Sequence, residues 1–361
     1  MEVVHCRFLT VLKMFGLNSA KSENERNKLL VLYNVILIII YAIILYFRFD
    51  NVVLTSLNWI KNTVVDLQMA IQVITFLSNV IANWLHSKRF YKCFQNLKPL
   101  DETLANFGFK HNYRRVNTIF SISFFVTFGF IVYVTICNYV SDVIVYERVS
   151  ICNWLSVYFV VTINYFSCYC MVIFLWFLIL RYKLLVRFLK RIVKSKTPAI
   201  YSNVEDLTVI KIFTNLFTTL NKISKFMISS FSLQICTMFL FTSISITNNL
   251  YLLLKEEFYS LKYLTVVNVF CMNLIELLAV IIAHYQLYLQ IDKIVALAPQ
   301  VVKIKCKPHK ESSNELLEYY LSIENNNLCV KVFGMFTVDP SNLLVIATCM
   351  VSYLIMMVQF T

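Results

Sequence analysis

The stretch from Trp154 to Leu180 reads WLSVYFVVTINYFSCYCMVIFLWFLIL and contains no charged side chain. A helix needs about 20 mainly apolar residues to cross a bilayer, whereas a membrane strand needs about 9–11 residues of alternating character. This stretch exceeds both lengths, and its apolar residues do not alternate with polar ones. It therefore predicts a membrane-spanning α-helix, and similar stretches occur along the rest of the chain.

The composition of the whole chain is that of a membrane protein. Of its 361 residues, 59% are hydrophobic and only 15% are charged, whereas a soluble domain carries about 25% charged residues. Gly (4) and Pro (5) are scarce, which excludes a loop-rich β-sandwich and disfavours enzymes whose phosphate-binding turns need glycines. The 11 Cys form no Cys-x-x-Cys pair, so we expect no disulfide framework, no metal and no cofactor.

Seven stretches are long and apolar enough to span a bilayer, and the second is the most polar of them because it holds Asp66, Gln72 and Asn79. The predicted fold class is therefore all-α, a polytopic membrane protein with seven transmembrane helices. The predicted spans are Leu29–Phe49, Val64–Leu85, Val116–Val140, Trp154–Leu180, Ile228–Leu254, Tyr263–Tyr288 and Asn342–Phe360.

The basic residues indicate the orientation of the chain in the membrane. The chain has 33 Lys and Arg, and nearly all lie in the N-terminal segment or in the second, fourth and sixth loops. The exceptions are Arg48, Lys61, Arg148, Lys255 and Lys262. Because cytoplasmic flanks are enriched in Lys and Arg, we predict an intracellular N-terminus and an extracellular C-terminus. Anionic lipid facing these flanks accounts for the net charge of +13, so no nucleic-acid partner is needed.

The inner connections are predicted to be helical. Arg181–Lys194 has its apolar residues on one stripe and its basic residues on the other, Val204–Phe226 leads into the fifth span, and Glu311–Val330 is a third candidate. Amphipathic helices need a partner for their apolar faces. These helices either form an anchor bundle where subunits meet, which we favour, or lie on the inner membrane surface. On the outer side, Cys137 and Cys152 at the ends of one loop either pair or remain free thiols.

The last predicted span carries a narrow polar stripe. Ser341, Thr348, Ser352 and Gln359 fall within about 40° of one another on a helix of 3.6 residues per turn. Met356 flanks the same line, and the rest of the helix surface is mostly apolar. Such a stripe either lines a water-filled pore formed by several copies of the helix or packs against a neighbouring helix of the same chain.

The residues that end this span resemble a known family signature. Ser352-Tyr353-Leu354-Ile355-Met356-Met357-Val358-Gln359-Phe360 is similar to the signature of insect gustatory receptors, Thr-Tyr followed by five apolar residues and Gln-Phe. The sequence departs from it only in having Ser352 for Thr, and both side chains carry a hydroxyl. Upstream, Val332–Asp339 resembles the turn of that family between its last cytoplasmic helix and its pore helix. Chain length, span number and orientation agree with this resemblance.

The resemblance implies a ligand-gated, non-selective cation channel in which four subunits each contribute their last helix to one pore. Gln359 and Phe360 would lie at the narrow outer part of the pore, Met356 would belong to the hydrophobic gate, and Tyr353 would pack behind the pore lining. The family implies four parts for the chain. These are a cytoplasmic segment at 1–28, helices with a ligand cavity in their outer half at 29–290, a cytoplasmic loop and anchor helix at 291–340, and the pore helix at 341–361.

Ionisable and aromatic residues within the spans are candidates for the ligand pocket. A charge at membrane depth is costly and usually faces a cavity or a partner. Asp66 and Glu276 are therefore candidates to bind a cationic or hydroxyl-rich ligand, and the alternative for Glu276 is a neutral carboxyl bonded to a neighbouring helix. The aromatic candidates are Tyr133, Tyr158 and Tyr251. His284 is better explained as a core histidine than as a ligand.

The predicted function is a gustatory receptor, a subunit of a homo- or heterotetrameric channel in the plasma membrane of sensory neurons. Its ligand would be a small-molecule tastant, with a bitter or aversive compound favoured over a sugar. The alternatives are an odorant-receptor-like channel, a G-protein-coupled receptor, which needs the opposite orientation, and a transporter, which usually has paired repeats or spans broken by Gly or Pro. An enzyme is the least supported class, because no nucleophile–base or metal constellation is present in the sequence.

Overall fold

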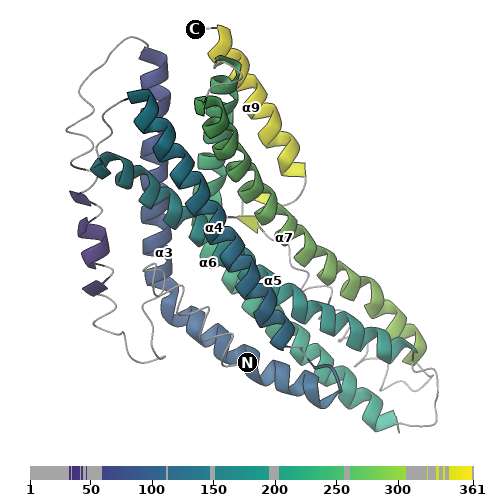
Figure 1. Ribbon diagram of the computed structural model, residues 1–361. Helices are drawn as coiled ribbons and strands as arrows, with labels where there is room; N and C mark the ends of the chain where they lie inside the picture. The colour runs from purple at the N-terminus through teal and green to yellow at the C-terminus, as the bar shows by residue number, and fades with distance from the viewer. Residues whose placement is uncertain are drawn as a thin grey trace.

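The computed structural model describes residues 59–110, 113–146, 151–194, 203–255, 261–305 and 341–359, the short segments 331–332 and 336–337, Ile323, and part of 32–46. The helices are α3 (Trp59–Asn106), α4 (Tyr113–Tyr146), α5 (Ile151–Lys194), α6 (Asn203–Lys255), α7 (Leu261–Lys305) and α9 (Ser341–Gln359). The most extensive helix–helix contacts are those of α5 with α7, α3 with α6, and α6 with α7. Helix α4 lies beside α5 and α7 (Figure 1). Figure 1 also shows α9 (yellow) at one end of the molecule, and α9 packs against α6.

The predicted spans coincide with observed helices. Val64–Leu85 lies in α3, Val116–Val140 in α4, Trp154–Leu180 in α5, Ile228–Leu254 in α6 and Tyr263–Tyr288 in α7. The last span is helical as far as Gln359, and the described residues of the first, between 32 and 46, are helical too. Among the described residues, four helices are long and apolar enough to cross a membrane, and Ala70–Ile81 and Leu344–Met356 are shorter apolar stretches. The chain is a multi-pass membrane protein of the predicted all-helical class.

Helices α3, α5, α6 and α7 continue well beyond their predicted spans. The prediction that the fourth span runs on as a basic amphipathic helix is confirmed, because α5 is unbroken to Lys194. The predicted helix Val204–Phe226 is likewise the first part of α6. Helix α3 also extends past its span through Pro99, and α7 extends through Pro299. Of the third candidate, Glu311–Val330, only Ile323 is described, and it is helical and buried.

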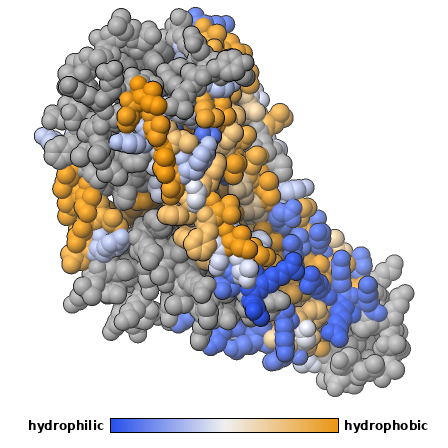
Figure 2. Space-filling view, in the orientation of Figure 1, coloured by the Kyte–Doolittle hydropathy of each residue, from blue (hydrophilic) through white to orange (hydrophobic). Residues whose placement is uncertain are grey.

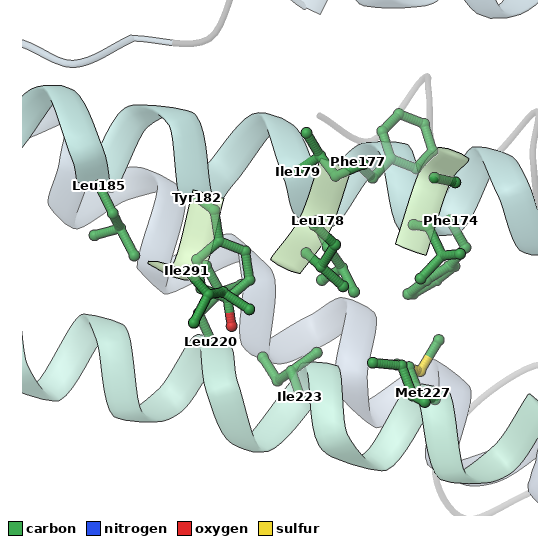
Figure 3. Packing of buried hydrophobic residues seen from close by; sticks show 14 of the residues in the cluster. Phe174, Phe177, Leu178, Ile179, Tyr182, Leu185, Leu220, Ile223, Met227 and Ile291 are labelled. Atoms are coloured by element: carbon green, nitrogen blue, oxygen red, sulfur yellow. The ribbon is translucent and has the colours of Figure 1, made fainter. Parts of the chain in front are cut away.

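The extensions bury their apolar faces against one another. Leu178, Tyr182, Leu185 and Leu189 follow one face of α5 and have no solvent exposure. Figure 3 shows this face meeting Leu220 and Ile223 of α6 and Ile291 of α7. Each fully buried Leu or Ile stabilises the packed state by about 1.5–3 kcal/mol relative to exposure to water. The apolar faces of α5 and α6 are therefore covered by the chain's own helices, which does not agree with helices lying on the membrane surface.

A buried ion pair joins α3 to α5 within this bundle. The guanidinium of Arg181 donates to both carboxylate oxygens of Asp101, Nη2 to Oδ2 at 2.8 Å and Nε to Oδ1 at 3.1 Å. A third bond, Nη1 to the carbonyl of Phe177, measures 3.0 Å. The two charged side chains are only 5% and 4% exposed. Because both charges are paired in a bidentate geometry, the cost of burying them is offset only while both partners are present.

A tight turn follows the end of α3. Gly108 adopts a φ of +84°, a left-handed conformation that other residues rarely take. The turn is held by aromatic contacts, since the rings of Phe107 and Phe109 lie 5.0 and 5.3 Å from that of Phe188. The guanidinium of Arg191 lies 5.7 Å from the ring centre of Phe109. The turn therefore ties the end of α3 to the basic end of α5.

The structure adds one feature to the all-α prediction, a two-stranded antiparallel hairpin of β1 (Lys331–Val332) and β2 (Phe336–Thr337). Lys331 pairs with Thr337, and Val332 pairs with Phe336. The hairpin falls in the segment whose sequence resembles the turn before the pore helix, and β1 contacts α6. The hairpin thus precedes α9 in the chain and lies against α6.

The surface divides into an apolar and a hydrophilic end. Figure 2 shows hydrophobic side chains over the upper part of the molecule and hydrophilic ones gathered at the lower right, where the helices extend past their spans. The C-terminal end of α9 lies at the opposite end from this hydrophilic region (Figure 1). This is the polarity expected of a bundle that is partly in lipid and partly in water.

Candidate functional site

A cavity of about 340 Å³ lies between α4, α5 and α7. Its volume is near the lower end of the range of about 300–1,000 Å³ that is typical of small-molecule pockets. Its walls are mainly apolar and aromatic, formed by Val126, Thr127, Phe130, Ile131, Tyr165, Cys168, Tyr169, Val172, Met272, Ile275, Glu276 and Ala279.

Helical periodicity explains why these residues share one space. Each of the three helices contributes four residues, which follow one another at intervals of one or three positions and therefore lie on one face. Glu276 lies near the midpoint of the predicted span Tyr263–Tyr288. The residues of α4 and α5 that line the cavity are likewise well away from both ends of their predicted spans. The cavity is thus at mid-depth in the helices, whereas the sequence predicted a cavity in their outer half.

The two tyrosines in the cavity wall have their hydroxyls engaged outside the cavity. Tyr165 donates to Oδ1 of Asn273 at 2.8 Å, and Nδ2 of Asn273 donates to Oγ of Ser245 at 2.7 Å. These bonds connect α5, α7 and α6. Tyr169 bonds Oγ of Ser123 on α4 at 2.8 Å. Both phenols therefore fix the relative positions of the helices around the cavity, and their rings supply apolar wall.

Glu276 is the acidic residue of this site. Its side chain is only 7% exposed, and it lines both the large cavity and a second, polar cavity of about 10 Å³. The smaller cavity is about the size of one water molecule. Cys168 also lines both cavities, and its thiol is a hydrogen-bonding neighbour of the carboxyl. Among the described residues that line the two cavities, none carries a positive charge.

Hydrogen-bonded polar side chains line the smaller cavity and continue beside it between α3 and α6. Nδ2 of Asn79 on α3 donates to Oδ1 of Asn164 on α5 at 2.9 Å, and Nε2 of Gln234 on α6 donates to the carbonyl of Asn79 at 3.4 Å. Ser78 and Thr237 bond across α3 and α6 at 3.2 Å. These contacts explain why the second span is rich in polar residues, since its amides and hydroxyls bond neighbouring helices within the membrane.

The structure brings together only some of the predicted pocket residues. Glu276 lines the cavity, but Tyr133 points outward with 49% of its surface exposed. Tyr251 is buried at 4% exposure, yet it packs against Tyr353 of α9 and not in the cavity. The side chains of Asp66 and Tyr158 lie outside the described residues.

The sequence prediction did not include Tyr165 and Tyr169, which form much of the cavity wall. They lie four residues apart in the middle of the span, away from the interfaces where tyrosines usually anchor helices. That position is the signal that would have identified them. His284 is buried with Nδ1 at 2.9 Å from the carbonyl of Val280, as expected of a core residue. Cys137 is a free thiol, and the side chain of Cys152 lies outside the described residues.

Helix α9 presents its polar stripe away from its own chain. Ile346 and Met350 pack on the main core, and Tyr353 and Leu354 pack on Tyr251. At about 100° per residue this packed face is roughly opposite to the stripe. The stripe residues Ser341, Thr348, Ser352 and Gln359 are all exposed. The second alternative, a stripe packed against a helix of the same chain, does not agree with this exposure.

The hydroxyls of the stripe donate hydrogen bonds to carbonyls of their own helix and keep acceptor capacity. Thr348 donates to the carbonyl of Leu344 at 2.8 Å, and Ser352 donates to that of Thr348 at 2.9 Å. Each hydroxyl oxygen still has lone pairs that face outward. Met356 is 51% exposed beside the same line, and Phe360 lies outside the described residues. The outward face therefore offers neutral oxygen acceptors followed by an apolar thioether and a terminal amide.

Known proteins match this architecture. The chain matches the family model described as 7tm Chemosensory receptor over residues 5–361. Its fold is similar to that of the insect olfactory receptor OR5 from Machilis hrabei in complex with eugenol, with a TM-score of 0.67, 13% identity, and coverage of 100% of this chain and 98% of that one. The structure of OR5 described without eugenol gives a TM-score of 0.63 at 13% identity, covering 98% and 97%. No curated protein sequence matches the chain. The chain belongs to the 7tm chemosensory receptor family.

Proposed function

We propose that this chain is a gustatory receptor, a subunit of a homo- or heterotetrameric, ligand-gated, non-selective cation channel in the plasma membrane of sensory neurons. A small-molecule tastant would occupy the cavity between α4, α5 and α7. Its binding would open a pore lined by α9, and cation entry would depolarise the neuron. A bitter or aversive compound fits this cavity better than a sugar, because few of its lining side chains can bond hydroxyl groups.

The observation that carries the proposal is the direction in which α9 faces. Its apolar face packs on α6, and its polar stripe points outward from the subunit. The hydroxyls of Thr348 and Ser352 already donate within the helix, but their lone pairs and the exposed amide of Gln359 gain further bonds only where they meet water or a polar partner. Four copies of the stripe around one axis would provide both. In that assembly Gln359 and Phe360 form the outer mouth, with Gln359 supplying a ring of neutral amides, and Met356 narrows the pore below it.

A line of contacts is available to couple the cavity to the pore. The bonds from Tyr165 through Asn273 to Ser245 connect the cavity wall to α6. Further along the same helix, Tyr251 packs against Tyr353 of α9. A ligand that shifts α7 relative to α5 would therefore displace α6 and, through the two tyrosines, α9. Drawing the four α9 helices apart would move Met356 off the pore axis.

The structure of OR5, which has a similar fold, supports a small organic ligand. OR5 from Machilis hrabei was solved in complex with eugenol, and that structure covers the whole of this chain. A cavity of about 340 Å³ with aromatic walls suits a molecule of that general kind. The hydrophilic end of the bundle would face the cytoplasm, where anionic lipid attracts its basic side chains. In that orientation the C-terminal end of α9, which lies at the opposite end of the molecule, would be outside the cell.

Patch-clamp recording of α9 variants tests the proposal. Gln359→Glu adds a ring of carboxylates and should raise the permeability of Ca²⁺ relative to Na⁺, whereas Met356→Ala should increase the current without ligand. Val358→Ala is the matched control, because Val358 adjoins Gln359 but points about 100° away from the stripe. Unchanged selectivity and gating in both test variants, at normal surface expression, would refute the pore assignment.

An odorant-receptor-like channel is the second candidate, and the similarity to an olfactory receptor favours it. It would share the pore and the cavity and differ in the ligand and in the cell that expresses it. Expression of the chain alone and with partner subunits, tested against tastants and volatile compounds, separates the two. Responses to volatiles alone would favour the odorant-receptor candidate. A G-protein-coupled receptor would instead display an N-terminal epitope on unpermeabilised cells.

A further inference from the structure

We infer that the ligand of the cavity between α4, α5 and α7 is a lipophilic organic cation, an aryl-alkyl amine whose ammonium group pairs with Glu276. The inference rests on the proposed function for the existence of a ligand, and it adds the chemical class. The apolar body of the amine would fill the space beside Phe130, Tyr165 and Tyr169. Three features of the site support this class: a buried acid, the few remaining polar groups, and an apolar opening.

The acid is the first feature. Glu276 is more than nine-tenths buried near the middle of a membrane span, and it lines the cavity. A carboxylate in this environment is costly unless a cation accompanies it. None of the described residues that line either adjoining cavity is basic. The polar cavity behind Glu276 has room for about one water. An ammonium group entering the large cavity would therefore supply the charge that the protein does not.

The scarcity of other polar groups is the second feature. The hydroxyls of Tyr165 and Tyr169 already bond Asn273 and Ser123. A polyol would need several bonding partners, since each hydroxyl buried without one costs about 1–3 kcal/mol. Besides Glu276, this cavity offers only the hydroxyl of Thr127 and the thiol of Cys168 among its described lining residues. An amine needs one strong acceptor, and the aromatic rings around it add attraction for a positive charge. The wall thus suits one cationic group on an otherwise apolar molecule.

The opening of the cavity is the third feature. Val126 of α4 and Ile275 of α7 both line it and are 65% and 58% exposed. Because both residues lie well inside the predicted spans, this side of the cavity borders the hydrocarbon of the bilayer. An amphiphilic amine concentrates in the membrane and can enter from there. A sugar does not partition into lipid and would not approach the site from this side.

Binding of matched probes to the purified protein in lipid nanodiscs tests the inference. 3-Phenylpropylamine and 3-phenylpropan-1-ol have nearly the same size and differ in the terminal group. Their affinities follow from the rise in melting temperature with probe concentration. Losing one partner of a buried charge pair weakens binding by about 30-fold or more. We therefore expect the amine to bind wild-type protein at least about 30-fold more tightly than the alcohol.

The variants assign this preference to one side chain. Glu276→Gln keeps the shape of the side chain and removes its charge. In this variant the amine and the alcohol should bind with about equal affinity. Glu102→Gln removes an exposed charge on α3 and should leave the preference unchanged. Glu276→Asp should retain a preference with weaker binding. Equal affinities in wild-type protein, no binding of the amine, or a preference that survives in Glu276→Gln would each overturn the inference. The wild-type comparison decides it even if Glu276→Gln does not fold.

The test separates this inference from the proposed function. If the amine binds through Glu276 but no cation current is found under any condition, the ligand class stands and the channel proposal fails. If currents depend on α9 as proposed while the amine shows no preference, the channel proposal stands and the ligand class is wrong.

Discussion

Removal of one partner of the Arg181–Asp101 pair should destabilise the protein strongly. In Asp101→Ala, the guanidinium of Arg181 loses two short hydrogen bonds of 2.8 and 3.1 Å and keeps its bond to the carbonyl of Phe177. Because the side chains are about 5% exposed, water cannot replace the lost partner. An unpaired buried charge of this kind costs about 3–5 kcal/mol. At roughly 2 °C per kcal/mol for a chain of this size, the melting temperature should fall by about 6–10 °C.

A double-mutant cycle isolates the pair from the rest of the bundle. Arg181→Met removes the charge and keeps apolar bulk, so Asp101→Ala/Arg181→Met should recover more than half of the loss seen in Asp101→Ala. The measurement is made on detergent-solubilised protein that is heated and then separated by fluorescence-detected size exclusion. The melting temperature is the temperature at which half of the monodisperse peak is lost. Glu102→Ala is the matched control, because this neighbouring acid is exposed and its removal should change stability by no more than about 0.5 kcal/mol. Additive losses in the double variant would show that the two charges are not coupled.

Three further predictions follow from the cavity and the bundle. Ala279→Phe fills the ligand cavity and should lower the potency of every agonist at least tenfold in calcium imaging at normal surface expression. Ile282→Phe lies on the exposed side of α7 and should leave the potency unchanged. Equal potency in the two variants would exclude the cavity as the ligand site. Asn273→Leu leaves Tyr165 and Ser245 without their bonds to this residue and should cost about 1–3 kcal/mol in the same thermal assay, and a loss of less than about 0.5 kcal/mol would contradict that geometry. Burial raises the pKa of the Cys93 thiol to about 11. At pH 7.5 its thiolate is therefore about 100-fold scarcer than that of an ordinary cysteine with a pKa near 9. Labelling of Cys93 by maleimide should be slower by a similar factor and should accelerate as the pH rises. Cysteine introduced at the exposed position of Glu102 is the comparison, and similar labelling rates at both positions would refute the burial of Cys93.

Hydropathy alone predicted most of the helical framework, because a membrane span is a local property of about 20 residues. The continuation of α5 to Lys194 was also predictable, since its apolar stripe keeps a helical period past Leu180. The pairing of Arg181 with Asp101 was not, because 80 positions separate them and either charge could have faced water. The passage of α3 through Pro99 is a similar case. Proline usually ends a helix, and here the packing of Leu97, Leu100 and Leu104 on the core outweighs that preference.

The candidate site was predicted less well than the fold. Glu276 was identified because an acid at membrane depth needs a local explanation. Tyr251 was assigned to the pocket and lies instead at the contact between α6 and α9, because a tyrosine near a span end suits a pocket, an interface or a helix contact equally well. The cavity itself depends on how the faces of α4, α5 and α7 meet, and a single sequence carries no direct signal of that meeting. The stripe on α9 was visible in the sequence, but its direction relative to α6 required the structure.

Cysteine accessibility along α9 tests the central claim, that the stripe faces a water-filled pore. In a Cys349→Ser background, cysteine is placed at Thr348 or Ser352 on the stripe and at Ile346 or Met350 on the packed face. A charged, membrane-impermeant thiol reagent is applied from outside to open channels in excised patches. If the stripe faces a pore, current should be lost rapidly and irreversibly at both stripe positions and should not change at either packed position. Modification of the packed positions with unreactive stripe positions would contradict this claim.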